Sequence, residues 1–297
     1  MNNENEIIEK KTFTKKLIII FFCFTITVTI FLLYSRYIET KRLIVKEYRI
    51  ENEKITNNFH GLKIVHISDI HYGRTVDIDY LKKIVNKINY INPDIVVLTG
   101  DLIDKDTNLN DKKADKISKE LNKINAKIGK YAIKGNHDYK FDKWNFIIEN
   151  SGFIDLDDNY DLIYKDTNDY ILLSGMSTNI YGDTKIEDKL NRVNEYLNNN
   201  QNNQPIYKIL LMHEPDFIDN FDYTQYDLIL AGHSHNGQVR LPFIGATILP
   251  PYGKKYYDNY YKLNNTELYI SSGIGVSSIN FRFLNPPSIN FYRLTHK

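Results

Sequence analysis

Two histidines one residue apart, in the stretch AGHSHNGQVR at 231–240, are spaced in a way that suggests chemistry. The chain has 8 histidines in 297 residues, and His233 and His235 lie between two glycines, where a hydrophobic core has no obvious use for them. Two imidazoles at this spacing can converge on one small volume and bind a metal ion, but they do not complete a site. The remaining ligands must come from elsewhere in the chain.

Four further segments carry imidazole, carboxylate or amide groups, and each follows an apolar run. Taken singly, each segment has a structural explanation, such as a hydrogen-bonded turn, a helix-capping aspartate or a buried core histidine. Taken together, five of the eight histidines lie with three aspartates and one asparagine at five successive strand ends, and independent explanations would have to coincide five times. We therefore expect these residues to form one site, and they are Asp69, His71, Asp101, Asn136, His137, Asp138, His213, His233 and His235.

The apolar patterns predict the elements that position these residues. Alternating strand and helix signals indicate an α/β fold with a mainly parallel interior sheet. Ligands of such sheets bind beyond the carboxyl ends of the strands, so the five segments should deliver their polar groups to one rim. Strands are predicted at 43–52, 62–69, 94–101, 131–134, 169–175, 207–211, 226–231, 268–275 and 288–295, and helices at 77–94, within 104–129, at 142–152 and at 186–200.

The ligand types narrow the chemistry. Imidazole, carboxylate and amide oxygen suit Zn, Fe, Mn, Ni or Co, and the single cysteine, Cys23, excludes both a thiolate zinc cluster and an internal disulfide. Seven ligands, one of them bridging, fit two divalent or trivalent ions about 3.5–4 Å apart. Such a pair produces hydroxide near neutral pH and clamps attacking and leaving oxygens, which makes phosphate esters the natural substrates.

The order D-x-H, G-D, G-N-H-D, a lone H and G-H-x-H, over about residues 62–237, resembles the calcineurin-like metallophosphoesterases. The resemblance implies two packed β-sheets flanked by helices, and a metal-bridging hydroxide as nucleophile without a covalent intermediate. It also implies that His137 is the general acid, oriented by Asp138. The implied ligands are Asp69, His71 and His235 for one ion, Asn136, His213 and His233 for the second, and Asp101 as the bridge.

A narrower resemblance is to the membrane-anchored, YkuE/YaeI-type bacterial members of this family, through SDIHYG, GDLID, GNHDY, HEPD and AGHSHNGQVRLP. It implies a phosphodiester or pyrophosphate substrate, with lipid-linked and nucleotide-linked esters as candidates. Asn236 replaces the usual second glycine of the last motif, and asparagine tolerates left-handed backbone angles. The glycines around His233 and His235 are expected to let the backbone approach the metals. Gln238 and Arg240 are candidates for substrate contact or for a structural role.

The N-terminal part predicts a membrane anchor. Leu17–Ser35 is a run of 19 residues without a charge, and a spanning helix needs roughly 20 such residues. A buried core helix and a cleaved signal are the alternatives, but the run has no polar face and no small-residue cleavage site. The predicted organisation is a polar tail (1–16), a transmembrane anchor (17–35), a linker and edge strand (36–52) and a catalytic domain (53–297).

The sequence also bears on the side of the membrane on which the catalytic domain lies and on the binding partners. Four lysines before the span face five basic residues after it, which gives no charge bias. The short tail resembles a signal anchor, so we expect a single-pass cell-membrane protein with an extracytoplasmic catalytic domain. The net charge of +1 makes nucleic acid an unlikely partner. A non-catalytic metal-binding protein and a nuclease of the same family are the alternative functions.

Overall fold

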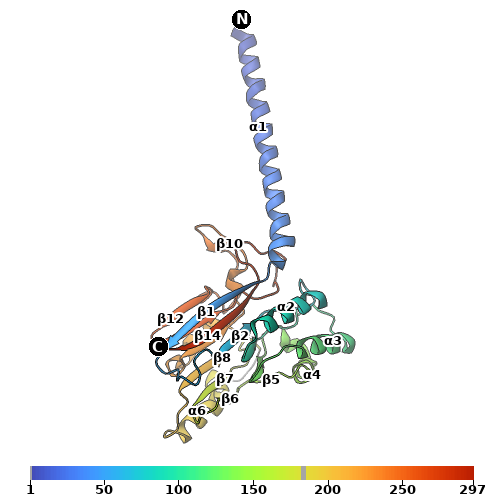
Figure 1. Cartoon of the computed structure of the whole chain (residues 1–297). Coiled ribbons are helices and arrows are strands. Elements are labelled where there is room, and N and C mark those ends of the chain that lie inside the picture. Colours follow the sequence, from blue (N-terminus) through green and yellow to red (C-terminus); the bar gives the residue numbers. More distant parts are fainter. Residues whose placement is uncertain (1, 182–184) are drawn as a thin grey trace.

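The apolar N-terminal run lies in one long helix that projects from the rest of the chain (Figure 1). The structure is a computed structural model that describes residues 2–181 and 185–297. The first helix, α1 (Asn2–Leu33), continues into a π-helical turn, η1 (Tyr34–Ile38), and a 3-10 turn, η2 (Glu39–Lys41). By length and composition, the stretch Lys10–Lys41 can cross a membrane, and its most apolar part is not buried against the body. It is therefore not a core helix of the body.

The first of two six-stranded sheets contains the strands of the first half of the chain and the last strand. All its neighbouring strands are parallel except β14 and β2. The edge strand β1 pairs with β14 over nine residues. The predicted domain boundary between residues 52 and 53 therefore separates this edge strand from the other strands of the same sheet. The order is β1 (Ile44–Asn52), β14 (Ser288–His296), β2 (Lys63–Ile67), β3 (Ile95–Thr99), β4 (Gly129–Ile133) and β5 (Ile154–Asp155).

The second sheet contains the strands of the second half of the chain, with antiparallel pairs at both edges and parallel pairs between. A separate two-stranded hairpin, β10 (Arg240–Leu241) and β11 (Gly245–Ala246), lies outside both sheets. The order of the second sheet is β12 (Tyr260–Leu263), β13 (Thr266–Ile270), β9 (Leu228–Ala231), β8 (Tyr207–Leu211), β7 (Tyr170–Gly175) and β6 (Asn159–Tyr164).

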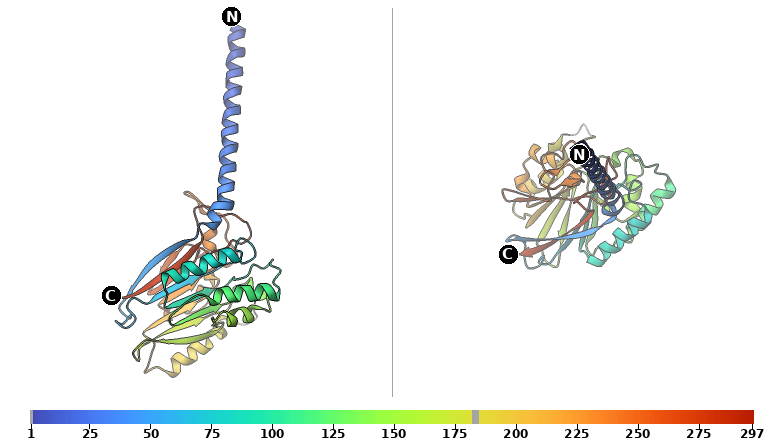
Figure 2. Two further views of the ribbon diagram at one scale, coloured as in Figure 1. Left: turned by 45° about the vertical axis from the view of Figure 1, so that its right-hand side comes forward. Right: turned by 90° about the horizontal axis from the view of Figure 1, so that it is seen from above.

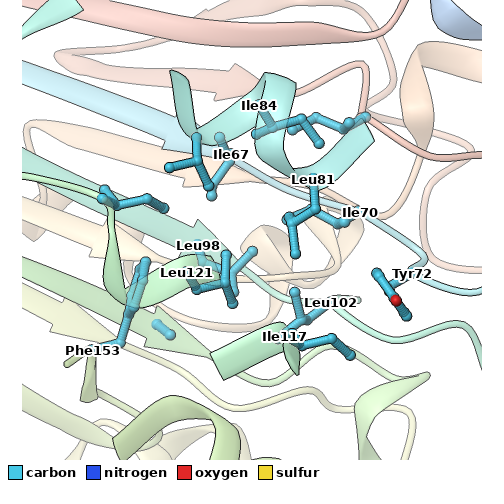
Figure 3. Packing of buried hydrophobic residues seen from close by; sticks show 14 of the residues in the cluster. Ile67, Ile70, Tyr72, Leu81, Ile84, Leu98, Leu102, Ile117, Leu121 and Phe153 are labelled. Atoms are coloured by element: carbon cyan, nitrogen blue, oxygen red, sulfur yellow. The ribbon is translucent and has the colours of Figure 1, made fainter. Parts of the chain in front are cut away.

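Helices cover the outer face of each sheet. Figure 3 shows Ile84 and Ile117, from helices on the first sheet, packing near Ile67 and Leu98 from its strands. A second cluster joins the inner faces of the two sheets, and a third covers the outer face of the second sheet. The predicted pair of packed sheets flanked by helices is confirmed. The helices are α2 (Ile78–Ile91), α3 (Asp111–Asn122), α4 (Trp144–Asn150), α5 (Ile186–Lys189) and α6 (Asn191–Asn199).

The local signals in α2 explain why its prediction was accurate. Its apolar residues recur at helical spacing and are buried. The carboxylate of Asp77 caps the helix by accepting the Tyr80 N–H, and Asn92 ends it in the left-handed conformation just before Pro93. α2 thus lies across β2 and β3, and its packing holds two of the strands that reach the predicted rim.

The mainly parallel interior predicted from the alternation is present in both sheets, and the half-exposed strands β6 and β12 are the antiparallel edges of the second. One expectation from periodicity is wrong in detail. The predicted helix 186–200 is divided at Leu190 (φ −96°, ψ 0°) into α5 and α6. At this break the Lys189 ammonium is buried and donates to the backbone oxygens of Ser177 and Thr178, which draws the chain inward.

Candidate metal centre

The two sheets bring the carboxyl ends of five strands to one rim. Strands β2, β3 and β4 are parallel neighbours in the first sheet, and β8 and β9 are parallel neighbours in the second. The loops after these strands hold all nine predicted site residues. The segments meet: His71 Nε2 lies 3.1 Å from His235 Nε2, and His213 Nε2 lies 3.2 Å from Asn136 Oδ1.

One buried cluster joins Asp69, His71 and His235. Their potential ligand atoms all lie within 4.8 Å of one another. Asp69 Oδ1 is 3.3 Å from His235 Nε2 and 3.9 Å from His71 Nε2. One carboxylate and two imidazoles thus face a common point, as a cation requires.

A second buried cluster joins Asp101, His213 and His233, with the same limit of 4.8 Å between ligand atoms. His213 Nδ1 lies 2.6 Å from the Thr99 carbonyl oxygen, and His233 Nε2 lies 2.7 Å from the Pro251 carbonyl oxygen. A carbonyl only accepts, so we assign the ring hydrogen to that nitrogen in each histidine. The other ring nitrogen then has a free lone pair, as a metal ligand needs.

Asp101 lies between the clusters. Its Oδ2 is 3.4 Å from His213 Nε2 in the second cluster and 3.6 Å from His71 Nε2 in the first. Its Oδ1 accepts the His137 backbone N–H at 2.7 Å, which fixes the carboxylate. A single aspartate therefore faces both groups of imidazoles.

The backbone at the predicted ligands is strained. Five non-glycine positions have φ between 45° and 64°, in the left-handed region that such residues rarely adopt. Each typically costs about 1–3 kcal/mol, and such strain clusters at functional sites because the surrounding structure maintains it. The five positions are Asp69, His71, Asp101, His233 and His235.

The electrostatics favour cations. Burial alone would raise the pKa of Asp69 and Asp101, but the surrounding imidazoles hold the pKa of each carboxyl well below its usual range. Burial would lower the pKa of His213, but Asp101 raises it well above its usual value. For His235, burial prevails over Asp69 and lowers the pKa to about 4. Buried carboxylates that stay ionised create a negative potential that suits metal ions.

The carboxylate nearest the His137 ring is not the predicted one. Asp104 Oδ2 lies 3.6 Å from His137 Nδ1 and 3.4 Å from His71 Nδ1. Burial would lower the pKa of His137, but Asp104 and then Asp101 raise it. Asp104 lies three residues after Asp101 in TGDLID, and this spacing was the only signal for it in the sequence.

The Asp138 carboxylate bonds to backbone N–H groups and not to the His137 ring that it is expected to orient. Its buried carboxylate accepts the backbone N–H groups of Leu102, Ile103 and Gly135 at 3.0–3.3 Å. In the described parts of the chain, no hydrogen bond joins it to the His137 ring. Burial, and then repulsion by Asp101, raise the pKa of Asp138 to about 7. Asp138 thus ties the loop after β4 to the loop after β3.

The last motif behaves partly as expected. Asn236 adopts φ 50°, which confirms that asparagine can take the place of glycine here. A side chain at Gly232 would collide with Ser68 and Asp69, which agrees with a close approach at the site, but Gly237 packs against Ala246 of the hairpin. The side chain of Gln238 has structural partners, since it donates to Ile279 O and accepts from Ser277 N.

Arg240 is also engaged within the chain, because it donates to Asn236 O and to Asp258 Oδ1. A further residue, Arg282, lies outside the sequence motifs, so no pattern predicts its role. Its guanidinium is fully buried, donates to Ser272 O at 2.7 Å and lies 3.4 Å from His235 Nδ1. Arg282 thus positions the ring of His235 from behind.

A cavity of about 690 Å³ opens above the two clusters. Asp101, Asn136 and His137 lie on its polar side. Its apolar wall comes mainly from the chain around the hairpin, and its members are Val239, Ile248, Leu249, Pro250, Pro251 and Tyr252. The site can therefore accommodate a polar group next to the clusters and an apolar group beside it.

The fold and the site together define an α/β protein with buried metal-ligand clusters at the strand ends of two stacked sheets. The family model "Calcineurin-like phosphoesterase" matches residues 62–237. The metallophosphoesterase YkuE of Bacillus subtilis is 33 % identical over 88 % of this chain and 88 % of its own length. The chain belongs to the calcineurin-like metallophosphoesterase family, whose members use divalent metals, and it is a metal-dependent phosphoester hydrolase.

Two further relatives have more specific names. A transmembrane protein with a metallophosphoesterase domain from Danio rerio is 29 % identical over 82 % of this chain and 56 % of its own length. The UDP-2,3-diacylglucosamine pyrophosphatase LpxG of Chlamydia trachomatis is 24 % identical over 89 % of this chain and 93 % of its own length.

Proposed function

We propose that the chain is a membrane-anchored phosphoesterase that uses two metal ions to hydrolyse a phosphodiester or pyrophosphate. The observation that supports it best is the position of Asp101, whose carboxylate faces imidazoles of both clusters. A shared carboxylate between two ligand groups is the arrangement that a pair of closely spaced ions requires.

The residues of the site fit this metal pair. Asp69, His71 and His235 would hold one ion, and Asp101 would be shared. The second ion would be held by Asn136, His213 and His233. When bound, the metals lower the pKa of water and neutralise charge on the phosphoryl oxygens. The oxygen and nitrogen ligands suit Mn, Zn, Fe, Ni or Co.

His137 is proposed as the general acid that protonates the leaving oxygen. Asp104 and Asp101 raise the pKa of His137 and so favour its protonated form, and the Lys105 backbone N–H faces Nδ1 at 3.2 Å, so the proton available for transfer is the one on Nε2. His137 lines the cavity, and its Nε2 is 4.0 Å from Asp101 Oδ2. The proton thus lies on the nitrogen nearer to the shared carboxylate, where the leaving group of a bound phosphoester would lie.

Asp104 is proposed to position His71 and His137 by its charge, since its Oδ2 lies 3.4 Å from His71 Nδ1 and 3.6 Å from His137 Nδ1. We expect Asp104→Asn to lower kcat by about 10–100-fold, because partners behind metal ligands and catalytic groups usually contribute this much. Asp106→Asn, two residues away at an exposed carboxylate, is the matched control and should keep wild-type kcat. If both variants have the same turnover as the wild type, Asp104 has no positioning role.

The apolar cavity wall and the pyrophosphatase relative support lipid-linked or nucleotide-linked phosphoesters as substrates. We further propose that residues 17–35 are an uncleaved single-pass anchor and that the catalytic domain lies outside the cytoplasm. The exposed apolar helix and the transmembrane relative support the anchor. Cleavage of the domain by protease added to intact cells would test the orientation.

The proposed reaction is tested by removing and restoring metal. A chelator should abolish hydrolysis of a chromogenic phosphodiester by the purified full chain, and added Mn should restore it. Metal analysis of the restored protein should give two ions per chain. Tight binding of metal without hydrolysis of any phosphoester in a broad panel would contradict the proposal, and one ion per chain at full activity would contradict the two-metal site.

A further inference from the structure

The tip of the β10–β11 hairpin exposes two large apolar side chains. Phe243 is fully exposed, and Ile244 exposes 72 % of its surface. The Ile244 N–H donates to Leu241 O, which closes a four-residue turn with Pro242 in its second position. Phe243, in the third position, has φ 65°, where turns of this kind usually have glycine or asparagine. A phenylalanine there strains the backbone without packing inside the chain, which points to a contact outside the chain.

The hairpin lies next to the end of α1. Phe283 connects them, because its backbone exchanges hydrogen bonds with Gln238 and Arg240 at the base of the hairpin. The Phe283 ring also packs against Phe31 of α1, with 4.5 Å between ring centroids. The hairpin, labelled β10 in Figure 1, lies on the side of the domain from which α1 projects. The left view of Figure 2 shows the same side of the domain below α1.

Residues typical of a membrane–water interface surround this junction. Tyr37, just after α1, exposes 61 % of its surface, and the Arg36 guanidinium lies 5.5 Å from the centroid of its ring. The same guanidinium lies 5.8 Å from the Phe281 ring. Leu284 is also exposed. Tyrosine side chains are enriched at membrane–water interfaces, and arginine side chains near the ends of spanning helices extend to the interface.

We propose that the tip of the hairpin is a second membrane contact, which inserts Phe243 and Ile244 into the bilayer that α1 crosses. This inference rests on the proposed anchor. Burial of these two side chains in the apolar part of the bilayer offsets the strain of the turn. The chain that returns from the tip supplies Ile248 and Leu249 to the cavity wall. The contact therefore holds the mouth of the cavity at the bilayer surface.

The experiment uses the full chain in phospholipid vesicles whose acyl chains carry bromine, which quenches tryptophan on contact. The sequence has one tryptophan, Trp144, which is buried in the domain and gives the background. We expect the bromolipid to quench Phe243→Trp emission by roughly half, because interfacial side chains reach about 5–10 Å into the headgroup–acyl boundary. The matched control is Tyr164→Trp, which replaces a side chain 51 % exposed on β6, at the end of the domain far from α1 (Figure 1).

Emission of Phe243→Trp that is no more quenched than the control, in protein that floats with the vesicles, would overturn the hairpin contact and leave the anchor intact. It is the result expected if the tip is instead a contact for a partner protein, which is not present in the vesicles. Protein that does not float with the vesicles would overturn both the anchor and the hairpin contact. Neither result bears on metal-dependent hydrolysis of a soluble diester, so failure of the proposed reaction is detected separately.

Discussion

Asp101→Asn is expected to lower kcat/KM by about 1,000-fold or more, because the loss of several kcal/mol of charge stabilisation corresponds to a factor of this size. Asn can still accept the His137 backbone N–H through its oxygen, so the change removes mainly the negative charge. That charge faces His71 in one cluster and His213 in the other. Metal content should therefore fall together with activity.

The measurements are the number of ions per chain and the hydrolysis of a chromogenic diester, with Asp106→Asn as the control. Asp106 lies on the same loop but is exposed, so its replacement should change neither quantity. Thermal unfolding shows whether the variant is still folded. Two retained ions and wild-type turnover in Asp101→Asn would exclude the shared-ligand role.

The sequence was most informative where side-chain type and strand ends coincide. Asp69, Asp101 and His213 each follow an apolar strand, and parallel neighbours in a sheet bring such ends together. The positive φ at Asp69 and His235 could not be predicted, because a motif does not specify the backbone angles that other loops impose. Strand ends can thus be read from residue type, but the conformation of the loops cannot.

The choice between Asp138 and Asp104 illustrates a second limit. Asp138 is adjacent to His137 in sequence, but its side chain turns toward the N–H groups of Leu102 and Ile103. Asp104 is 33 residues from His137 and faces its ring because β3 and β4 are parallel neighbours. Sequence proximity therefore favoured Asp138, whereas the register of the sheet brings Asp104 to the ring.

The apolar hairpin tip illustrates a third limit. Leu241–Ile244 contains two large exposed apolar residues, too few to stand out in a hydropathy profile next to the long run in α1. Their significance depends on the position of Phe283, which is about 40 residues away in sequence and contacts α1. Tertiary structure alone brings the tip to the side of α1.

His137→Ala is expected to lower kcat by about 100–10,000-fold for a phosphodiester with an alkyl leaving group, the usual contribution of a general acid. The loss should be much smaller for a nitrophenyl ester, because nitrophenolate leaves without a proton. His60→Ala, at an exposed histidine, controls for the substitution. The comparison of two leaving groups thus isolates proton donation from binding.

The site also offers a competing role for His137, since His71, Asp101 and His137 form a third group whose potential ligand atoms lie within 4.8 Å. A metal ligand and a proton donor differ in two measurable ways. Loss of a ligand lowers metal content and slows both esters alike, whereas loss of an acid leaves the metal in place and slows the alkyl ester more. Because the Lys105 N–H occupies Nδ1 and leaves the hydrogen on Nε2, we expect the second pattern. Equal losses for both esters, with an ion missing, would make His137 a ligand.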